Sequence, residues 1–196
     1  MAELRLFVAC ELPGDVRDGL GRVEADLRRG DRVGLRWVRP EGIHVTLKFL
    51  GGVDETRVEE ITAALAAAIE PFELRLRPAT VGGFPSAGLR AGGGARLRVI
   101  WVGLEGDIEG LAALAARVEA ALQPLGFPAE RRPFAAHLTL ARVPDRASAV
   151  ERRELSELVG GYRMPELPPM VLTQVALMRS ILGPNGSVYN RLAGFP

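Results

Sequence analysis

Apolar residues recur along this chain with two different periods, and the periods alternate from segment to segment. An apolar residue every three or four positions is typical of a helix with one buried face, and it occurs over residues 15–29, 54–69, 108–122 and 148–159. Shorter apolar or alternating runs predict strands, over residues 4–9, 35–38, 43–50, 72–77, 97–102, 137–141 and 170–181, with a return strand at 188–189. Residues 79–95, rich in Gly and Pro, are predicted to form a loop.

The series of predicted elements occurs twice. Phe7 precedes His44 by 37 residues, and Trp101 precedes His137 by 36, so the two aromatic residues are expected at equivalent positions. A repeat of this kind predicts two similar lobes related by a pseudo-twofold axis, about residues 1–95 and 96–196 of a single domain over residues 1–196. We expect an α+β fold in which each lobe is a largely antiparallel sheet with two helices and a cleft separates the lobes. A doubly wound parallel sheet is the alternative.

The two histidines of the chain lie in the same short pattern. His44 is followed by Thr46, and His137 by Thr139, each with a Leu in the next position. With six threonines in 196 residues, a Thr two positions after both histidines has a chance of about one in a thousand. The pattern is therefore a motif that occurs twice in the chain.

Strand alternation predicts how these residues point. In the first copy His44, Thr46 and Lys48 share one face, whereas Leu47 and Phe49 share the apolar face. By the same parity, His137 and Thr139 lie opposite Leu138 and Leu140. We expect the two polar faces to confront each other across the cleft.

Composition limits the classes of function. The net charge is +1, so no global field indicates nucleic acid or a membrane. All basic residues but Lys48 are arginines, which can hold phosphate in a forked geometry. Cys10 is the single cysteine, so no internal disulfide forms, and its apolar setting predicts a buried, inert thiol. No apolar run reaches the length of a membrane span, and a cytoplasmic protein is expected.

Two imidazoles that face one centre suit acid–base chemistry. One neutral imidazole can take a proton from water, and the other, charged, can protonate a departing oxygen. A hydroxyl beside each can donate to the oxygens of a phosphate. Two histidines without a carboxylate at ligand spacing make a poor zinc site, and no Gly-x-Ser-x-Gly indicates acyl transfer. The residues fit phosphoester cleavage without a metal; two structural His–Thr pairs are the alternative.

At these motifs the chain resembles the 2H phosphoesterase superfamily, and within it the RNA 2′,3′-cyclic phosphodiesterases, also called 2′-5′ RNA ligases (LigT-like). The resemblance extends over residues 5–9, 36–38, 43–51, 83–85, 133–142 and 178–189. Ala136 stands where the group usually has Pro before the second histidine. The resemblance implies a two-lobed fold and hydrolysis of 2′,3′-cyclic phosphate ends of RNA to 2′-phosphomonoesters, with reversible 2′-5′ joining in some relatives.

The resemblance also implies roles for single residues. His44 is implied as the proton donor, His137 as the proton acceptor, and Thr46 and Thr139 as phosphate ligands. No metal or cofactor is implied. The implied substrates are RNA ends bearing the cyclic phosphate, with tRNA halves among the candidates, and a monomer without an obligate protein partner is expected.

Arg142 is a further candidate for contact with phosphate or RNA. Strict alternation puts it on the side of Leu138 and Leu140, away from the cleft, but Val143-Pro144 ends the strand pattern and could turn it inward. Two alternatives to the RNA-end hydrolase remain open. One is a phosphodiesterase for small cyclic nucleotides or 2′-5′ oligonucleotides, and the other is a protein that binds RNA ends without turnover.

Overall fold

A computed structural model describes residues 2–84, 97–183 and 186–196. Its helices are α1 (Gly14–Arg29), α2 (Val58–Ala68), α3 (Ile108–Leu122) and α4 (Ala149–Gly161). Its strands are β1 (Glu3–Glu11), β2 (Arg36–Trp37), β3 (His44–Asp54), β4 (Leu74–Phe84), β5 (Val99–Gly106), β6 (His137–Arg142), β7 (Met170–Leu172), β8 (Val175–Gly183) and β9 (Gly186–Phe195). Short 3-10 turns precede β3 (Pro40–Gly42), precede α2 (Glu55–Arg57) and follow α3 (Gln123–Leu125).

All the strands belong to one antiparallel sheet. Its order is β7-β4-β5-β6-β3-β1-β8-β9, and β2 pairs with β6 outside this path. The α+β prediction is confirmed, and the parallel alternative is wrong. The two strands that begin with histidine, β3 and β6, are neighbours at the centre of the sheet.

The halves of the chain exchange strands across this centre. β4, from the first half of the sequence, pairs with β5 and β7, whereas β8 and β9 bring the end of the chain to β1. Two predictions fail for this reason. Residues 79–84 continue β4 and are not a loop, and residues 170–181 form two strands because β7 pairs with β4 and β8 with β1. Residues 85–95 of the predicted loop, and residues 184–185 of the last turn, lie outside the described residues.

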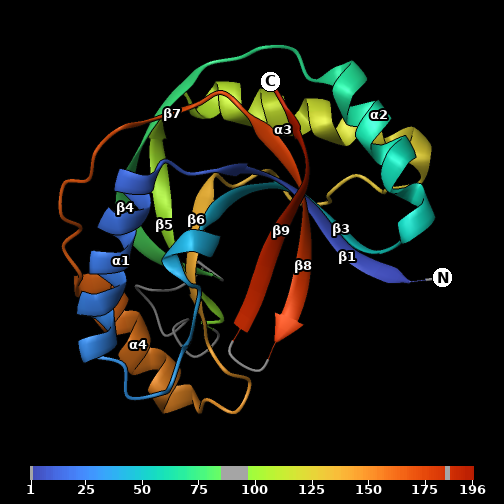
Figure 1. The fold of residues 1–196 in the computed structure, drawn as a ribbon. Coiled ribbons are helices and arrows are strands. Elements are labelled where there is room, and N and C mark those ends of the chain that lie inside the picture. The colour runs from blue at the N-terminus through green and yellow to red at the C-terminus, as the bar shows by residue number, and fades with distance from the viewer. Residues whose placement is uncertain (1, 85–96, 184–185) are drawn as a thin grey trace.

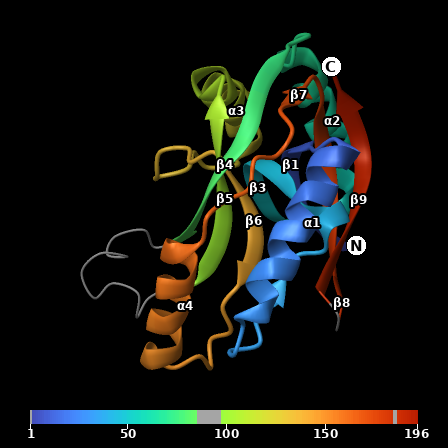
Figure 2. The same ribbon diagram turned by 90° about the vertical axis from the view of Figure 1, so that its left-hand side faces the viewer.

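The main core lies between one face of the sheet and the helices. Figure 1 shows α1 and α4 along one side of the sheet and α2 with α3 across one end, and Figure 2 shows α1 and α4 in front of the strands. The predicted apolar face of α1 is buried, with Val16, Leu20, Val23 and Leu27 no more than 2% exposed. Among the described residues no helix is long and apolar enough to cross a membrane.

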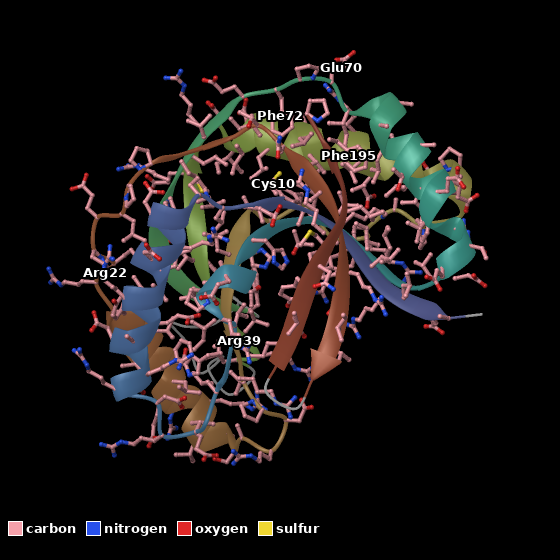
Figure 3. All side chains as sticks on the ribbon, viewed as in Figure 1. Cys10, Arg22, Arg39, Glu70, Phe72 and Phe195 are labelled. Atoms are coloured by element: carbon pink, nitrogen blue, oxygen red, sulfur yellow. The ribbon has the colours of Figure 1, made fainter. Side chains whose placement is uncertain are left out.

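Cys10 lies inside this core, as Figure 3 shows. Burial raises the pKa of its thiol to about 12, so the nucleophilic thiolate is not formed near neutral pH. The prediction of a buried, unreactive thiol agrees with this environment.

A smaller cluster lies on the opposite face of the sheet. It consists of Phe7, Ala9, Ala176 and Met178, with Tyr189 packed against it. Phe7 and Ala9 alternate along β1 with Leu6 and Val8, which belong to the main core. The sheet therefore has two apolar sides at β1, and the second side carries the aromatic residues next to the first histidine.

Glu24 is an ionisable residue in the main core. Its side chain on α1 is 2% exposed, with Arg28 at 3.7 Å from one carboxylate oxygen, and its other oxygen has no hydrogen-bond partner among the described residues. Burial raises the pKa of Glu24 to about 8, although Arg28 lowers it and Glu41 raises it further. The carboxyl group is therefore protonated in the folded protein at neutral pH.

We predict that Glu24→Gln stabilises the protein at high pH. The unfolded carboxyl ionises near its ordinary pKa of 4.5 and the folded one only near 8, so wild-type stability falls as pH rises between these values. The amide removes this loss and should raise the free energy of unfolding by roughly 4 kcal/mol at pH 8 and by nearly nothing at pH 4. Urea unfolding at both pH values, with exposed Glu59→Gln as the control, measures the difference; equal effects at both would contradict the assignment.

Candidate functional site

The site begins with the contact between β3 and β6. These strands pair through Val45 and Leu138, which lie opposite each other and are both fully buried in the main core. Since neighbouring residues of a strand point to opposite faces, the residues on either side of this pair point away from the helices. One residue pair therefore fixes which side chains lie on the face of the sheet opposite the main core.

Four polar side chains take those positions. In the antiparallel register His44 lies beside Thr139, and Thr46 lies beside His137, so each imidazole has the threonine of the other motif as its neighbour. All four residues are partly exposed, in contrast to the buried pair between them. The structure thus brings the four predicted site residues of the two motifs together on one face.

Both imidazoles are held by the same hydrogen bond. His44 Nδ1 lies 2.7 Å from the Gly42 carbonyl oxygen, and His137 Nδ1 lies 2.7 Å from the Ala135 carbonyl oxygen. A carbonyl oxygen can only accept, so Nδ1 is the protonated nitrogen in both rings. In each neutral imidazole Nε2 is therefore unprotonated and carries a lone pair. This nitrogen can accept a proton, and once protonated it can donate one.

Aromatic rings surround the two imidazoles unequally. The ring of Phe7 stacks on His44 at 4.7 Å between centroids, and the ring of Tyr189 meets His44 edge-on at 5.1 Å. Among the residues that the structure describes, His137 has one such neighbour, Phe84, edge-on at 5.0 Å. His44 is consequently more enclosed than His137.

The predicted equivalence of Phe7 and Trp101 is wrong. Trp101 lies opposite Thr139 on β6, and the residue opposite Thr46 on β3 is Ala9. Trp101 therefore corresponds to Ala9. The small side chain of Ala9 leaves the space through which the Phe7 ring reaches His44.

Burial lowers the pKa of both histidines. For His44 it lowers the pKa to about 4, opposed by the Gly42 carbonyl and assisted by the positive charges of His137 and Arg142. For His137 burial again lowers the pKa, opposed by the Ala135 carbonyl and assisted by Arg142. Both imidazoles are neutral in the unliganded protein at pH 7, and a charge on His137 disfavours a charge on His44.

An extra residue follows the threonine in each motif. On β3, Thr46 pairs with Ala9 and Lys48 with the next residue of β1, Val8, so Leu47 is a bulge. On β6 the register skips Leu140 in the same way, since Thr139 pairs with Trp101 and Ala141 with Ile100. A bulge reverses the faces of the residues that follow it, and on β3 this holds as far as a second bulge at Leu50.

The first bulge turns Lys48 away from the face of the histidines, contrary to the prediction that it shares that face. Its side chain is 2% exposed, and its ammonium group donates to the Glu119 carboxylate and, at 2.8 Å, to the Pro128 carbonyl oxygen. The other oxygen of Glu119 accepts from the Glu130 backbone N–H at 3.0 Å. Lys48 therefore ties β3 to α3 and to the segment that leads into His137.

The two bulges place Phe49 and Arg142 on the face of the histidines. Phe49, predicted on the apolar face, is 57% exposed, and its ring lies 6.3 Å from that of Phe7. Arg142 is exposed, and its charge lowers the pKa of both imidazoles. Arg142 reaches the site because of the bulge at Leu140. Strict alternation places both side chains on the opposite face. The sequence Thr-Leu does not indicate a bulge, so their true positions could not be predicted.

A cleft of about 1700 Å³ opens beside the second histidine. Thr46, Lys48, Phe49, Phe84 and His137 line it, and α3 and the segment before β6 form further walls. His44 and Thr139 are not among its lining residues. Within the described ranges no group of three or more His, Cys, Asp or Glu side chains is placed to hold a metal ion. The carboxylates of Glu119, Glu130 and Asp145 and the guanidinium groups of Arg98, Arg132 and Arg152 also line the cleft.

The contact between β3 and β6, with His44, Thr46, His137 and Thr139 on one face, is called the histidine seam. A family model matches the sequence of both strands. The model is described as LigT-like phosphoesterase, and it covers residues 11–92 and 102–189. The chain belongs to this family. This phosphoesterase is 32% identical over 196 residues to the RNA 2′,3′-cyclic phosphodiesterase of Methanothermobacter thermautotrophicus, covering 98% of each chain. It is also 32% identical to the protein of that name from Archaeoglobus fulgidus, covering 98% of this chain and 99% of that one.

Solved structures give the same fold. A protein from Thermus thermophilus is 30% identical, with a TM-score of 0.67 over 97% of this chain and 96% of that one. Escherichia coli LigT, solved in complex with 3′-AMP, is 22% identical, with a TM-score of 0.73 over 98% of this chain and 97% of that one. The family resemblance and the two-lobed α+β fold expected from the sequence are confirmed.

We predict two separate histidine titrations in the unliganded protein. His44 should titrate near pH 4, and His137 below 6.5. Tyr189→Ala opens one side of His44 to water and should raise its pKa toward 6.5, whereas Phe84→Ala should act on His137 instead. NMR titration of the ring protons measures this directly, since the chain has two histidines. A His44 pKa of 6.5 or above in the wild type would contradict the role of burial.

Proposed function

We propose that this phosphoesterase hydrolyses the 2′,3′-cyclic phosphate at the end of an RNA to a 2′-phosphomonoester, using His44 and His137 as acid and base without a metal. The observation that carries the proposal is the pair of imidazoles on one face, each with Nδ1 bound to a carbonyl and Nε2 free. The names of the relatives, RNA 2′,3′-cyclic phosphodiesterases, support the choice of substrate.

The reaction needs one proton acceptor and one proton donor. Neutral His137 takes a proton on Nε2 from a water molecule as the water oxygen bonds to phosphorus. The bond from phosphorus to the 3′ oxygen breaks, and protonated His44 gives its Nε2 proton to that oxygen. The product carries a free 3′ hydroxyl and a 2′ phosphate, and transfer of the proton from His137 back to His44 through solvent restores the site.

The substrate itself supplies the charge that His44 requires. In the free protein the pKa of His44 is about 4, so burial opposes the protonated donor. A phosphodiester anion at the seam adds a negative charge beside both rings and favours the imidazolium form. Binding and protonation are therefore coupled, and the mutual repulsion of the rings favours a single proton shared by the pair.

The remaining site residues hold the phosphate. Thr46 and Thr139 lie beside the opposite histidines, where their hydroxyls can donate to the non-bridging oxygens. Arg142 adds a guanidinium group that can bind these oxygens in a forked geometry. Replacing water by a 5′ hydroxyl of RNA in the same step would join two ends through a 2′-5′ bond. The proposed substrates include tRNA halves, and the step requires one copy of the chain.

We predict that either His44→Ala or His137→Ala lowers turnover of a cyclic-phosphate-ended RNA by about 100-fold or more, because each variant removes one of the two proton transfers. Rates at saturating substrate, with the product identified as 2′- or 3′-phosphate, measure the effect. Wild-type rates in both variants would exclude the acid–base pair.

Two controls separate this proposal from its alternatives. Activity should persist in EDTA; loss in EDTA and recovery with Zn²⁺ would indicate metal chemistry. With excess protein, release of the ring-opened product shows catalysis, whereas stoichiometric binding of an intact cyclic end would indicate a binding protein.

We predict bell-shaped pH profiles for both kcat/KM and kcat, with the profile of kcat/KM at lower pH than the profile of kcat. kcat/KM reports the free protein, where both histidine pKa values are below 6.5, so its alkaline limb should fall below pH 6.5. Bound phosphate raises these pKa values, so the alkaline limb of kcat should lie at higher pH. An alkaline limb of kcat/KM above pH 7.5 would show that another group is the acid.

A further inference from the structure

Two arginines lie directly opposite each other next to the histidine seam. Arg36 on β2 pairs with Arg142 on β6, and the adjacent pair is Trp37 with Ala141. Ala141 is fully buried and Trp37 packs against the core, so Arg36 and Arg142 share the opposite face, the face of the histidines. Both arginine side chains are exposed.

The position of this pair relative to the histidines follows from β5. Thr139 pairs with Trp101 and Arg142 with Val99, two residues further along β5 and roughly 7 Å away. Arg142 is close enough to both imidazoles for its charge to lower their pKa values. Arg36 lies one strand beyond Arg142, on the side of β6 where β2 takes the place of β3.

No acidic partner balances these charges within the described part of the chain. None of the ion pairs there includes Arg36 or Arg142, and neither guanidinium group donates a hydrogen bond to another described residue. Like charges directly opposite on adjacent strands destabilise a sheet. An anion between the two guanidinium groups removes this repulsion and accepts forked hydrogen bonds from both.

The geometry points to a second phosphate subsite at Arg36, which binds the internucleotide phosphate on the 5′ side of the nucleotide whose cyclic phosphate lies between His44 and His137. Arg142 lies between the two phosphates and serves both. This inference rests on the proposed function and narrows its substrate to oligonucleotides, because a cyclic mononucleotide has no second phosphodiester.

A comparison of two substrates tests the subsite. One is a dinucleotide ending in a 2′,3′-cyclic phosphate, and the other is the cyclic mononucleotide with the same base. Arg36→Gln should lower kcat/KM for the dinucleotide roughly 10-fold and change that for the mononucleotide less than about 2-fold. The matched control is Arg22→Gln on α1, which removes the same charge from an exposed side chain that points away from the molecule (Figure 3); it should affect neither substrate.

A neutral methylphosphonate linkage in the dinucleotide isolates the contact. For the wild type, kcat/KM on this analogue should fall by about the same factor as Arg36→Gln causes on the natural linkage. For Arg36→Gln, kcat/KM should fall little further when the natural linkage is replaced by the analogue. Equal losses on mononucleotide and dinucleotide, or no loss on either, would overturn the subsite. A full additional loss of the variant on the methylphosphonate would show that Arg36 acts elsewhere.

Equilibrium binding keeps this test separate from catalysis. The dissociation constant of a dinucleotide ending in a 2′-phosphate should rise roughly 10-fold in Arg36→Gln and stay unchanged in Arg22→Gln. If the wild type cleaves neither substrate but shows this binding pattern, the proposed hydrolysis fails and the subsite stands. If it cleaves both substrates and the binding pattern is absent, the subsite fails and the hydrolysis stands. Unchanged histidine titrations in the variant show that the site is folded.

Discussion

The antiparallel contact of Val45 with Leu138 is the constraint on which the site depends. Both side chains are fully buried under the helices, so a shift of one residue in either strand would bury the histidines and expose the apolar residues. The cost of that exchange fixes the register. It also places each imidazole beside the threonine of the other motif, although 93 residues separate the two histidines in the chain.

A bulge after each threonine then determines what surrounds this centre. Without the bulges, Lys48 would lie on the face of the histidines, and Phe49 and Arg142 would lie on the opposite face. With them, Lys48 is paired with Glu119 beneath the sheet, while an exposed aromatic ring and a guanidinium group flank the imidazoles. The two motifs are alike in backbone but different in these side chains, so the site is symmetric in its histidines and threonines and asymmetric in its surroundings.

Electrostatics at the seam favour an anion. Burial keeps both imidazoles neutral in the free protein, Arg142 opposes their protonation, and Arg36 lies opposite Arg142 without an acidic partner in the described residues. A phosphate would offset the arginine charges and stabilise the imidazolium that the proposed acid catalysis requires. In the unliganded site both imidazoles are neutral, and binding of an anion would favour their protonation.

The sequence by itself predicted the helices and the groups that we propose to be catalytic. The period of Val16, Leu20, Val23 and Leu27 predicted α1, and the repeated His-x-Thr pattern identified His44, Thr46, His137 and Thr139, because periodicity and spacing are local properties. Only the tertiary structure decided the direction of Lys48, Phe49 and Arg142, the split of residues 170–181 into β7 and β8, and the meeting of Arg36 with Arg142. Each of these depends on which strand lies alongside, and strand partners distant in sequence leave no local pattern.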